Sequence, residues 1–138
     1  NEFIENEASL PDTPTIDLSN FSILVAEDND INRLVIEEFL TETKADLHFA
    51  INGLEAVALA SSTHLDLILM DIQMPEMDGI EACRRIKAAQ PNLPIVALTA
   101  NVMADYVAKY QKEGFDDYLA KPVEFEQLIA KLELLLTA

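Results

Sequence analysis

The stretch "LILMDIQMPEMDG" (residues 67–79) places a carboxylate directly after a segment that suits burial. Four apolar residues lead into Asp71, and a loop with Pro75 and an Asp-Gly pair follows. Short apolar runs bounded by turn residues are typical of strands that are buried on both faces of a parallel sheet. The stretch therefore predicts a core strand with an acidic residue at its carboxyl end.

From Phe21 onward, strand and helix patterns alternate. The predicted strands cover residues 21–26, 46–51, 65–70, 94–99 and 118–121, and the predicted helices cover residues 30–43, 53–62, 79–90, 104–114 and 124–137. Strands that are each followed by a helix imply a parallel sheet covered on both sides. We expect a three-layer, doubly wound α/β fold with a five-stranded parallel sheet in the order 2-1-3-4-5.

The apolar spacing also predicts which helix faces point into the core. The predicted inward residues are Ile31, Leu34, Val35 and Phe39 in the first helix and Leu54, Val57 and Ala58 in the second helix. The last helix carries its apolar residues on one face, at Phe125, Leu128, Ile129, Leu132, Leu135 and Leu136. These three faces are expected to cover the sheet.

The chain divides into a tail and one domain. Residues 1–20 are acidic, contain Pro11 and Pro14 and show no sustained period, so we expect a flexible linker or tail there. Residues 21–138 form the expected domain. The sequence begins with Asn instead of Met, which suggests a piece of a longer protein or a processed chain.

Composition excludes several classes of function. The net charge of −16, from 25 acidic and nine basic residues, argues against binding to nucleic acid or to anionic membrane surfaces. No apolar run approaches the roughly 20 residues of a membrane helix. The lone Cys83 cannot form an internal disulfide, so we expect a small buried residue and a reducing, cytoplasmic setting.

Polar side chains stand at the carboxyl ends of four predicted strands. Glu27 and Asp28 follow the first strand, and Asp71 follows the third. Thr99 ends the fourth strand and Lys121 ends the fifth. In the 2-1-3-4-5 order the first and third strands are neighbours, and ligands bind where the strand order switches. These side chains are therefore expected to converge on one crevice.

The converging residue types suit one kind of chemistry. Carboxylates within a few ångströms repel each other, and a divalent cation such as Mg²⁺, which prefers oxygen ligands, removes that conflict. An aspartate can act as a nucleophile and form an aspartyl phosphate. The phosphoryl oxygens then need positive charge and hydrogen-bond donors, which the lysine and threonine supply.

Each residue also has a simpler explanation when it is taken alone. Glu27 and Asp28 could cap the following helix. Asp71 could be a solvated loop acid. Thr99 could be an ordinary strand residue, and Lys121 could be a surface lysine. A chance arrangement of all of them at one end of four strands is improbable.

Four motifs, "ILVAEDNDINRLV", "LILMDIQMPEMDGIEACRRI", "PIVALTA" and "DDYLAKPV", occur in this order. Together they resemble the receiver domains of two-component response regulators, over residues 21–137. The resemblance implies the flavodoxin-like receiver fold. The "EDNDINR" and "LTAN" variants are most similar to receivers attached to hybrid sensor histidine kinases.

The resemblance implies a role for each site residue. Asp71 is the implied phosphoacceptor, which takes a phosphoryl group from a phosphohistidine. Asp28, Asp71 and the backbone carbonyl of Gln73 are the implied ligands of Mg²⁺, for which Mn²⁺ could substitute. Glu27 would help to bind the metal, directly or through water. Lys121 would contact the phosphoryl group.

The same resemblance implies a conformational switch. Thr99 would move to hydrogen-bond the phosphoryl group, with the backbone amide of Ala100 nearby. Tyr118 would turn inward when Thr99 moves. The Lys121-Pro122 peptide bond would be cis, which is plausible before proline and rare elsewhere.

The implied partner is a histidine kinase or a histidine phosphotransfer domain, with no direct contact to nucleic acid or membrane. The fragment itself would be a phosphoacceptor switch in the cytoplasm and not a turnover enzyme. Its parent would be a histidine kinase, a transferase, with an anchor in the inner membrane. Ile36 and Leu40 of the first helix would either dock a phosphotransfer module or add core contacts.

Several alternatives remain at this stage. A stand-alone single-domain response regulator would carry similar motifs. An Asp-nucleophile phosphatase needs a second acid two residues after the nucleophile, where this chain has Gln73. A flavodoxin needs a phosphate-binding loop after the first strand, and the acidic "AEDNDINR" would repel the phosphate of FMN. A degenerate receiver used only for docking would not need the complete set of site residues.

Overall fold

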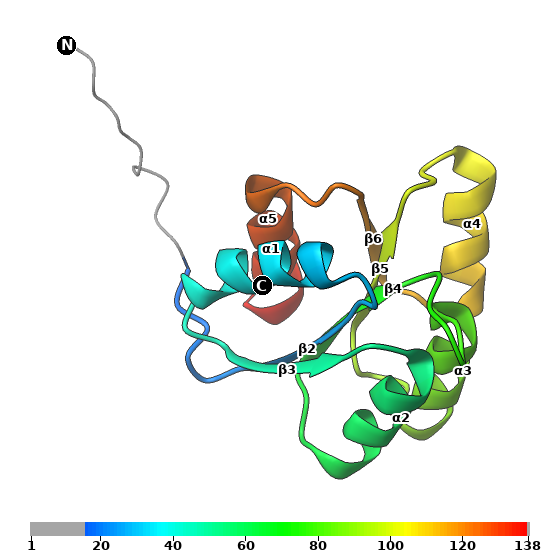
Figure 1. Cartoon of the computed structure of the whole chain (residues 1–138), viewed down its shortest axis with the longest axis horizontal. Coiled ribbons are helices and arrows are strands. Elements are labelled where there is room, and N and C mark those ends of the chain that lie inside the picture. The colour runs from blue at the N-terminus through cyan, green and yellow to red at the C-terminus, as the bar shows by residue number, and fades with distance from the viewer. Residues whose placement is uncertain (1–15, 138) are drawn as a thin grey trace.

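The computed structural model describes residues 16–137, in which strands and helices alternate along the chain (Figure 1). The strands are β2 (Ser22–Ala26), β3 (Asp46–Ala50), β4 (Leu67–Asp71), β5 (Ile95–Thr99) and β6 (Asp117–Ala120). The helices are α1 (Asp30–Thr41), α2 (Gly53–Ser62), α3 (Gly79–Ala89), α4 (Ala104–Glu113) and α5 (Phe125–Leu136). Every element predicted from Phe21 onward is present, with ends that shift by one or two residues.

The strands form one parallel sheet in the order β3-β2-β4-β5-β6, which confirms the predicted 2-1-3-4-5 order. β2 and β4 are neighbours, and Ala26 pairs with Met70 at their carboxyl ends. Asp71 is the last residue of β4 and pairs with Leu98, so the acid belongs to the strand itself. The sheet order therefore brings the ends of β2 and β4 together at the switch point.

Helices cover both faces of the sheet and create two separate cores (Figure 1). Helices α1 and α5 lie on one face, where Leu40 and Leu128 pack against Val25 and Leu69. Helices α2, α3 and α4 lie on the other face, where Ala82 and other small residues pack against alternate residues of the same strands. All residues of β4 and β5 are buried, which explains their continuous apolar sequence.

The predicted inward faces of α1 and α2 are only partly correct: Phe39 and Val57 are partly buried and pack against the cores, whereas the other predicted residues are exposed. In α1, Ile36 and Leu40 are buried, so they contribute to the core. Ile31, Leu34 and Val35 are 73%, 53% and 38% exposed. The faces differ because α1 carries apolar residues on two sides, and periodicity alone cannot show which side meets the sheet.

In α2 the buried residues are Gly53, Ala56 and Ala60, whereas Leu54 is about half exposed. Small side chains let α2 approach the sheet closely. The inward face of α5 is confirmed, because Leu128, Ile129 and Leu132 are buried.

Side-chain caps define where the site-facing helices begin. Asn29, Asn52 and Asp78 accept hydrogen bonds from backbone amides in the first turns of α1, α2 and α3, which satisfies donors without an intrahelical partner. Gly114 ends α4 in the left-handed conformation, with φ of 115°, as its position in the sequence predicts. These caps fix the loops that follow β2, β3 and β4.

Part of the segment that the sequence assigns to the tail packs against the domain. Leu18 is completely buried in the core beneath α1 and α5. Its amide donates to the carbonyl of Thr43, and its carbonyl accepts from the amide of Phe21. Residues 1–15 of the expected tail lie outside the described residues.

Two expectations from composition can be compared with the described residues. Cys83 is buried, as predicted, and burial raises the pKa of its thiol to about 11. Within residues 16–137, the helices are all too short or too polar to cross a membrane.

Candidate functional site

Three carboxylates meet at the carboxyl ends of β2 and β4. Glu27 and Asp28 directly follow β2, and Asp71 ends β4. One oxygen from each of them lies within 4.8 Å of the others, a spacing that could hold a metal ion. Glu27 and Asp71 are buried, whereas Asp28 is exposed. The predicted convergence of these acids is therefore present in the structure.

Glu27 is held rigidly at this position. Its amide donates to the carbonyl of Ala50, and its carbonyl accepts from Arg33 Nη1 at 2.8 Å. Its Oε2 accepts from the amide of Asn29 at 3.2 Å. Among the described residues, the buried Oε1 has no hydrogen-bond partner in acceptable geometry. Arg33 is thus a positioning residue that the sequence pattern does not predict.

The environment favours the protonated form of Glu27. Burial, together with the neighbouring Asp71 carboxylate, raises the pKa of Glu27 to about 7. The amide of Asn29 and the Lys121 ammonium oppose this shift. The cluster therefore carries more negative charge than its immediate surroundings neutralise.

Lys121 is the cation of the site. Its Nζ lies 2.9 Å from Asp71 Oδ1 and 3.1 Å from Glu27 Oε1. Burial alone would lower its pKa, but the carboxylates of Asp71 and Glu27 outweigh that effect and raise it. The Lys121-Pro122 peptide bond that follows β6 is cis, as the resemblance implies.

Thr99 ends β5 at the same edge of the sheet and is buried. Its hydroxyl lies 2.7 Å from the hydroxyl of Tyr110, a buried residue of α4. Thr99 Oγ1 also accepts from the amide of Asn101 at 3.0 Å and lies 3.1 Å from the carbonyl of Asn101. The hydroxyl of Tyr110 lies 3.2 Å from that same carbonyl.

Tyr110 is a site residue that the sequence pattern does not predict. Nothing in the spacing of the predicted helix over residues 104–114 places an aromatic hydroxyl beside Thr99. Only the packing of α4 against the sheet creates this contact.

A cavity of about 930 Å³ connects most of the predicted site residues. Its lining includes Glu27, Asp28, Asp71, Gln73, Thr99, Ala100, Asn101, Tyr110 and Lys121. The amide of Gln73 donates to Asp71 Oδ1 over 3.4 Å. Tyr118 does not line this cavity; it lies in β6, with Lys131 Nζ 5.7 Å from the centre of its ring.

Gly79 closes the loop that follows Asp71. Its amide donates to the carbonyl of Ile72, and it is the first residue of α3. A β-carbon at this position would lie 2.0 Å from the carbonyl oxygen of Asp71. The loop can therefore return to β4 only because residue 79 has no side chain.

Comparison with known proteins shows the family. The response regulator receiver domain model matches residues 23–133. Peroxide stress-activated histidine kinase mak1 of Schizosaccharomyces pombe is 41% identical over 118 residues, which cover 80% of this chain and 7% of that protein. Signal transduction histidine-protein kinase BarA of Escherichia coli is 40% identical over 109 residues, 78% of this chain and 12% of that protein.

Solved structures that resemble this chain are also receiver domains. The receiver domain of sensor histidine kinase PA1611 from Pseudomonas aeruginosa, with magnesium coordinated in its active site cleft, has a TM-score of 0.79 and 35% identity, covering 86% of this chain and 98% of that chain. The co-crystal structure of Saccharomyces cerevisiae Ypd1 with the receiver domain of Ssk1 has a TM-score of 0.79 and 34% identity. The match covers 83% of this chain and 88% of that chain.

The chain spans only a small part of the curated relatives that it matches, between 3% and 13% of their length. Those relatives include histidine kinases of bacteria, a yeast and a slime mould. The matched region contains the parallel sheet except Ser22, and every residue of the acidic cluster. The chain therefore belongs to the response regulator receiver domains of two-component phosphorelays, and its relatives are the receivers of hybrid histidine kinases.

Proposed function

We propose that Asp71 accepts a phosphoryl group from a phosphohistidine of a partner protein. One observation carries this proposal: a buried aspartate ends a core strand, opens into the cavity and contacts a lysine ammonium. A buried carboxylate with a cation beside it is poised to act as a nucleophile and to have its product stabilised.

In the proposed step, an Asp71 carboxylate oxygen attacks the phosphorus atom. The new O–P bond forms as the P–N bond to the donor histidine breaks, and the electron pair of that bond returns to the imidazole nitrogen. Lys121 would then balance the charge on the phosphoryl oxygens. The hydroxyl of Thr99 and the amide of Ala100 lie in the same cavity and would serve as hydrogen-bond donors.

The acidic cluster suits Mg²⁺ as cofactor, with Mn²⁺ as a substitute. Among residues 16–137, the buried Glu27 Oε1 has an ion pair with Lys121 but no well-oriented hydrogen bond, and Lys121 is the only cation paired with the buried acids. Asp28, Asp71 and the backbone carbonyl of Gln73 would hold the ion, with Glu27 reaching it directly or through water. The ion would neutralise charge on the phosphoryl oxygens.

The phosphodonor is proposed to be a histidine kinase or a histidine phosphotransfer domain. Ile31, Leu34 and Val35 form an exposed apolar stripe on α1, whose first turn borders the acidic cluster. An exposed stripe of this kind is typical of a helix-docking surface. We further propose that the parent protein is a hybrid sensor kinase whose receiver lies in the cytoplasm.

The switch that follows phosphorylation is proposed to involve Thr99 and Tyr118. Thr99 would leave its present partners for the phosphoryl group. Tyr118, which is partly buried in β6, would then turn towards the space that Thr99 vacates. The added charge at one end of the sheet would shift the populations of two conformations.

The test is phosphorylation of the chain by a small phosphodonor such as acetyl phosphate, followed by mass spectrometry. We expect the Asp71→Asn variant to fold and to take up no phosphoryl group. The Asp105→Asn variant, which removes an exposed acid from the first turn of α4, should be labelled like the wild type. An Asp71→Asn variant that is labelled as fully as the wild type would disprove the assignment.

A further inference from the structure

The hydroxyl of Thr99 is fully engaged in the present conformation. It contacts the hydroxyl of Tyr110, the carbonyl of Asn101 and the amide of Asn101, at 2.7, 3.1 and 3.0 Å. A hydroxyl has one proton, so every arrangement that satisfies these contacts uses the Thr99 proton within this cluster. Thr99 therefore has no proton to offer to a phosphoryl group on Asp71 until the cluster rearranges.

That rearrangement breaks all three contacts of the Thr99 hydroxyl, and the contact with Tyr110 is the shortest of them. When Thr99 leaves, the hydroxyl of Tyr110 can keep donating to the carbonyl of Asn101, which lies 3.2 Å away. The Asn101 amide loses its acceptor, and Tyr110 loses the 2.7 Å bond between the two hydroxyls, which is buried and shorter than the other contacts of the cluster. Its loss therefore opposes the departure of Thr99.

Tyr110 also lies between the two parts of the proposed switch. It lines the large cavity that contains Asp71 and Thr99. It lines a second cavity of about 190 Å³ as well, and Tyr118 lines that cavity. A change at Thr99 can thus reach the surroundings of Tyr118 through the ring of Tyr110.

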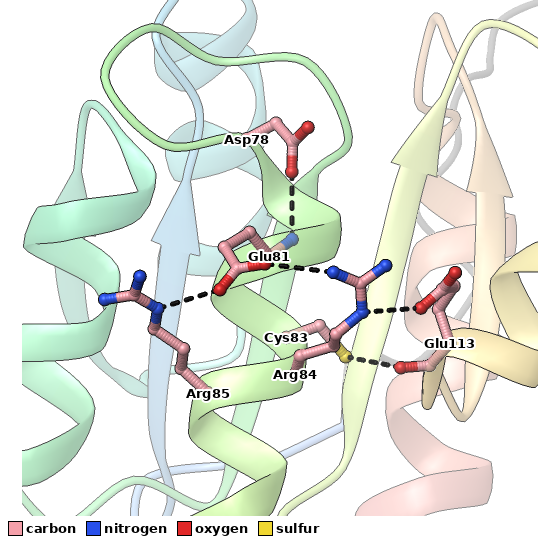
Figure 2. A network of polar contacts seen from close by, with 6 residues as sticks. All are labelled: Asp78, Glu81, Cys83, Arg84, Arg85 and Glu113. Atoms are coloured by element: carbon pink, nitrogen blue, oxygen red, sulfur yellow. Dashed lines mark hydrogen bonds and ion pairs between the residues drawn. The ribbon is translucent and has the colours of Figure 1, made fainter.

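The two ends of α4 are attached to the rest of the domain in different ways. At its carboxyl end, Glu113 accepts from Arg84 Nε at 2.8 Å, and Arg84 Nη1 in turn binds Glu81 of α3 (Figure 2). At its amino end, no side chain caps the helix, and Asn101 Oδ1 accepts from the amide of Met103. The amino end is therefore held through the residues that bind Thr99.

We infer that Tyr110 is a positioning residue that holds the hydroxyl of Thr99 away from phosphorylated Asp71 and couples the position of Thr99 to α4. This inference rests on the proposed function of Asp71. The hydrogen bond between Tyr110 and Thr99 stabilises the unphosphorylated conformation, so the site must break it to reach the phosphorylated one. Removing the Tyr110 hydroxyl shifts the population towards the phosphorylated conformation.

The Tyr110→Phe variant tests this inference because it removes only the hydroxyl and keeps the ring. The probe is beryllium fluoride, an analogue of the phosphoryl group, titrated in saturating Mg²⁺ and followed by amide NMR. We expect Tyr110→Phe to bind the probe about two- to tenfold more tightly than the wild type, the net value of one hydrogen bond. Amide signals of α4 should already lie closer to their bound positions before the probe is added.

Tyr106→Phe is the matched control, because Tyr106 lies one turn earlier in α4 and lines the same cavity, whereas the hydroxyl that binds Thr99 is that of Tyr110. Its affinity for the probe should equal that of the wild type. In a Thr99→Val background, which has no hydroxyl to hold, Tyr110→Phe should have no further effect. In a Thr99→Ser background, which restores the hydroxyl, the effect should return.

Two results would overturn the inference: an unchanged affinity in Tyr110→Phe, or an increase that persists in the Thr99→Val background. The affinity for Mg²⁺ alone provides a further check, since it does not depend on Thr99 and should stay the same in Tyr110→Phe. Failure of the proposed function looks different. In that case the wild type would not bind the probe, or Asp71→Asn would bind it equally well.

Discussion

The ammonium of Lys121, the residue directly after β6, lies 2.9 Å from Oδ1 of Asp71, the last residue of β4. The same ammonium lies 3.1 Å from Glu27 Oε1. One cation is thus shared between two buried acids. One ammonium cannot neutralise both carboxylates, so the charge of the cluster should respond to pH and to bound metal ions.

Replacing Lys121 with methionine should slow the phosphorylation of Asp71. The variant keeps the length of the side chain and removes the charge that would stabilise the phosphoryl oxygens. Loss of one such group costs about 100-fold or more in rate. Rates of labelling by acetyl phosphate measure this effect. Lys112→Met, which removes an exposed lysine near the end of α4, should react at the wild-type rate.

The stability of the metal-free protein should fall as the pH rises through the range in which Glu27 titrates. Its pKa is about 7 in the folded chain and about 4.5 in the unfolded chain, so the folded state holds the proton more tightly. The stabilising contribution is complete below pH 4.5 and is lost as the pH rises to 7 and above.

Glu27→Gln should remove this dependence, because glutamine resembles the protonated acid. Between pH 5 and pH 8, we expect the wild type to lose about 2 kcal/mol of unfolding free energy relative to Glu27→Gln. Urea denaturation in EDTA at several pH values measures the difference. Parallel pH profiles for the two proteins would contradict the assignment.

Mg²⁺ should stabilise the chain, and more strongly at pH 8 than at pH 6. Binding at Glu27, Asp28 and Asp71 requires deprotonated carboxylates, so metal and proton compete. At a concentration ten times its dissociation constant, the ion raises the free energy of unfolding by about 1.4 kcal/mol. Thermal unfolding with and without MgCl₂ measures the shift. Asp28→Asn should abolish it, whereas Glu38→Gln, which removes an exposed acid of α1, should retain it.

Gly79→Ala should destabilise the fold although alanine is the better helix former. In the interior of an ordinary helix, replacing glycine with alanine increases stability by about 1 kcal/mol. Here the new β-carbon would lie 2.0 Å from the carbonyl oxygen of Asp71, so the loop or β4 must move. We expect the free energy of unfolding to fall by about 2 kcal/mol or more. An equal or increased stability in urea denaturation would show that the loop can relax.

Lys87→Met should cost more stability than Arg84→Met. Lys87 Nζ is mostly buried and binds the carbonyl of Leu93 and Asp116 Oδ2, each at 2.7 Å. Arg84 is about half exposed, and the value of an exposed ion pair is below about 1 kcal/mol. Removing Lys87 takes this donor away from the part-buried carbonyl of Leu93, and an unsatisfied group of that kind costs about 1–3 kcal/mol. Chemical denaturation of both variants provides the comparison.

The alternation of apolar runs and amphipathic segments was sufficient to predict the elements, the parallel sheet and its order. The site followed from the same pattern, since polar residues at strand ends must share an edge of the sheet. Glu27, Asp71 and Lys121 lie together as expected. This part of the structure depends on sequence spacing and topology alone.

The inward faces of α1 and α2 could not be predicted in the same way. Ile36 and Ile31 are equally apolar, yet only Ile36 is buried. The choice depends on the angle at which each helix crosses the sheet, and that angle depends on the size of side chains from other elements. The contact between Thr99 and Tyr110 is of the same kind, because it joins a strand end to a helix through tertiary packing.

The burial of Leu18 has a consequence for where the domain can be cut. A shortened chain that starts at Phe21 would keep every strand and helix found within residues 16–137 but would leave a gap beneath α1 and α5. It would also leave the carbonyl of Thr43 without its donor. The shortest fragment that keeps the full stability of the domain therefore starts before β2 and includes Leu18, whose side chain fills this part of the core.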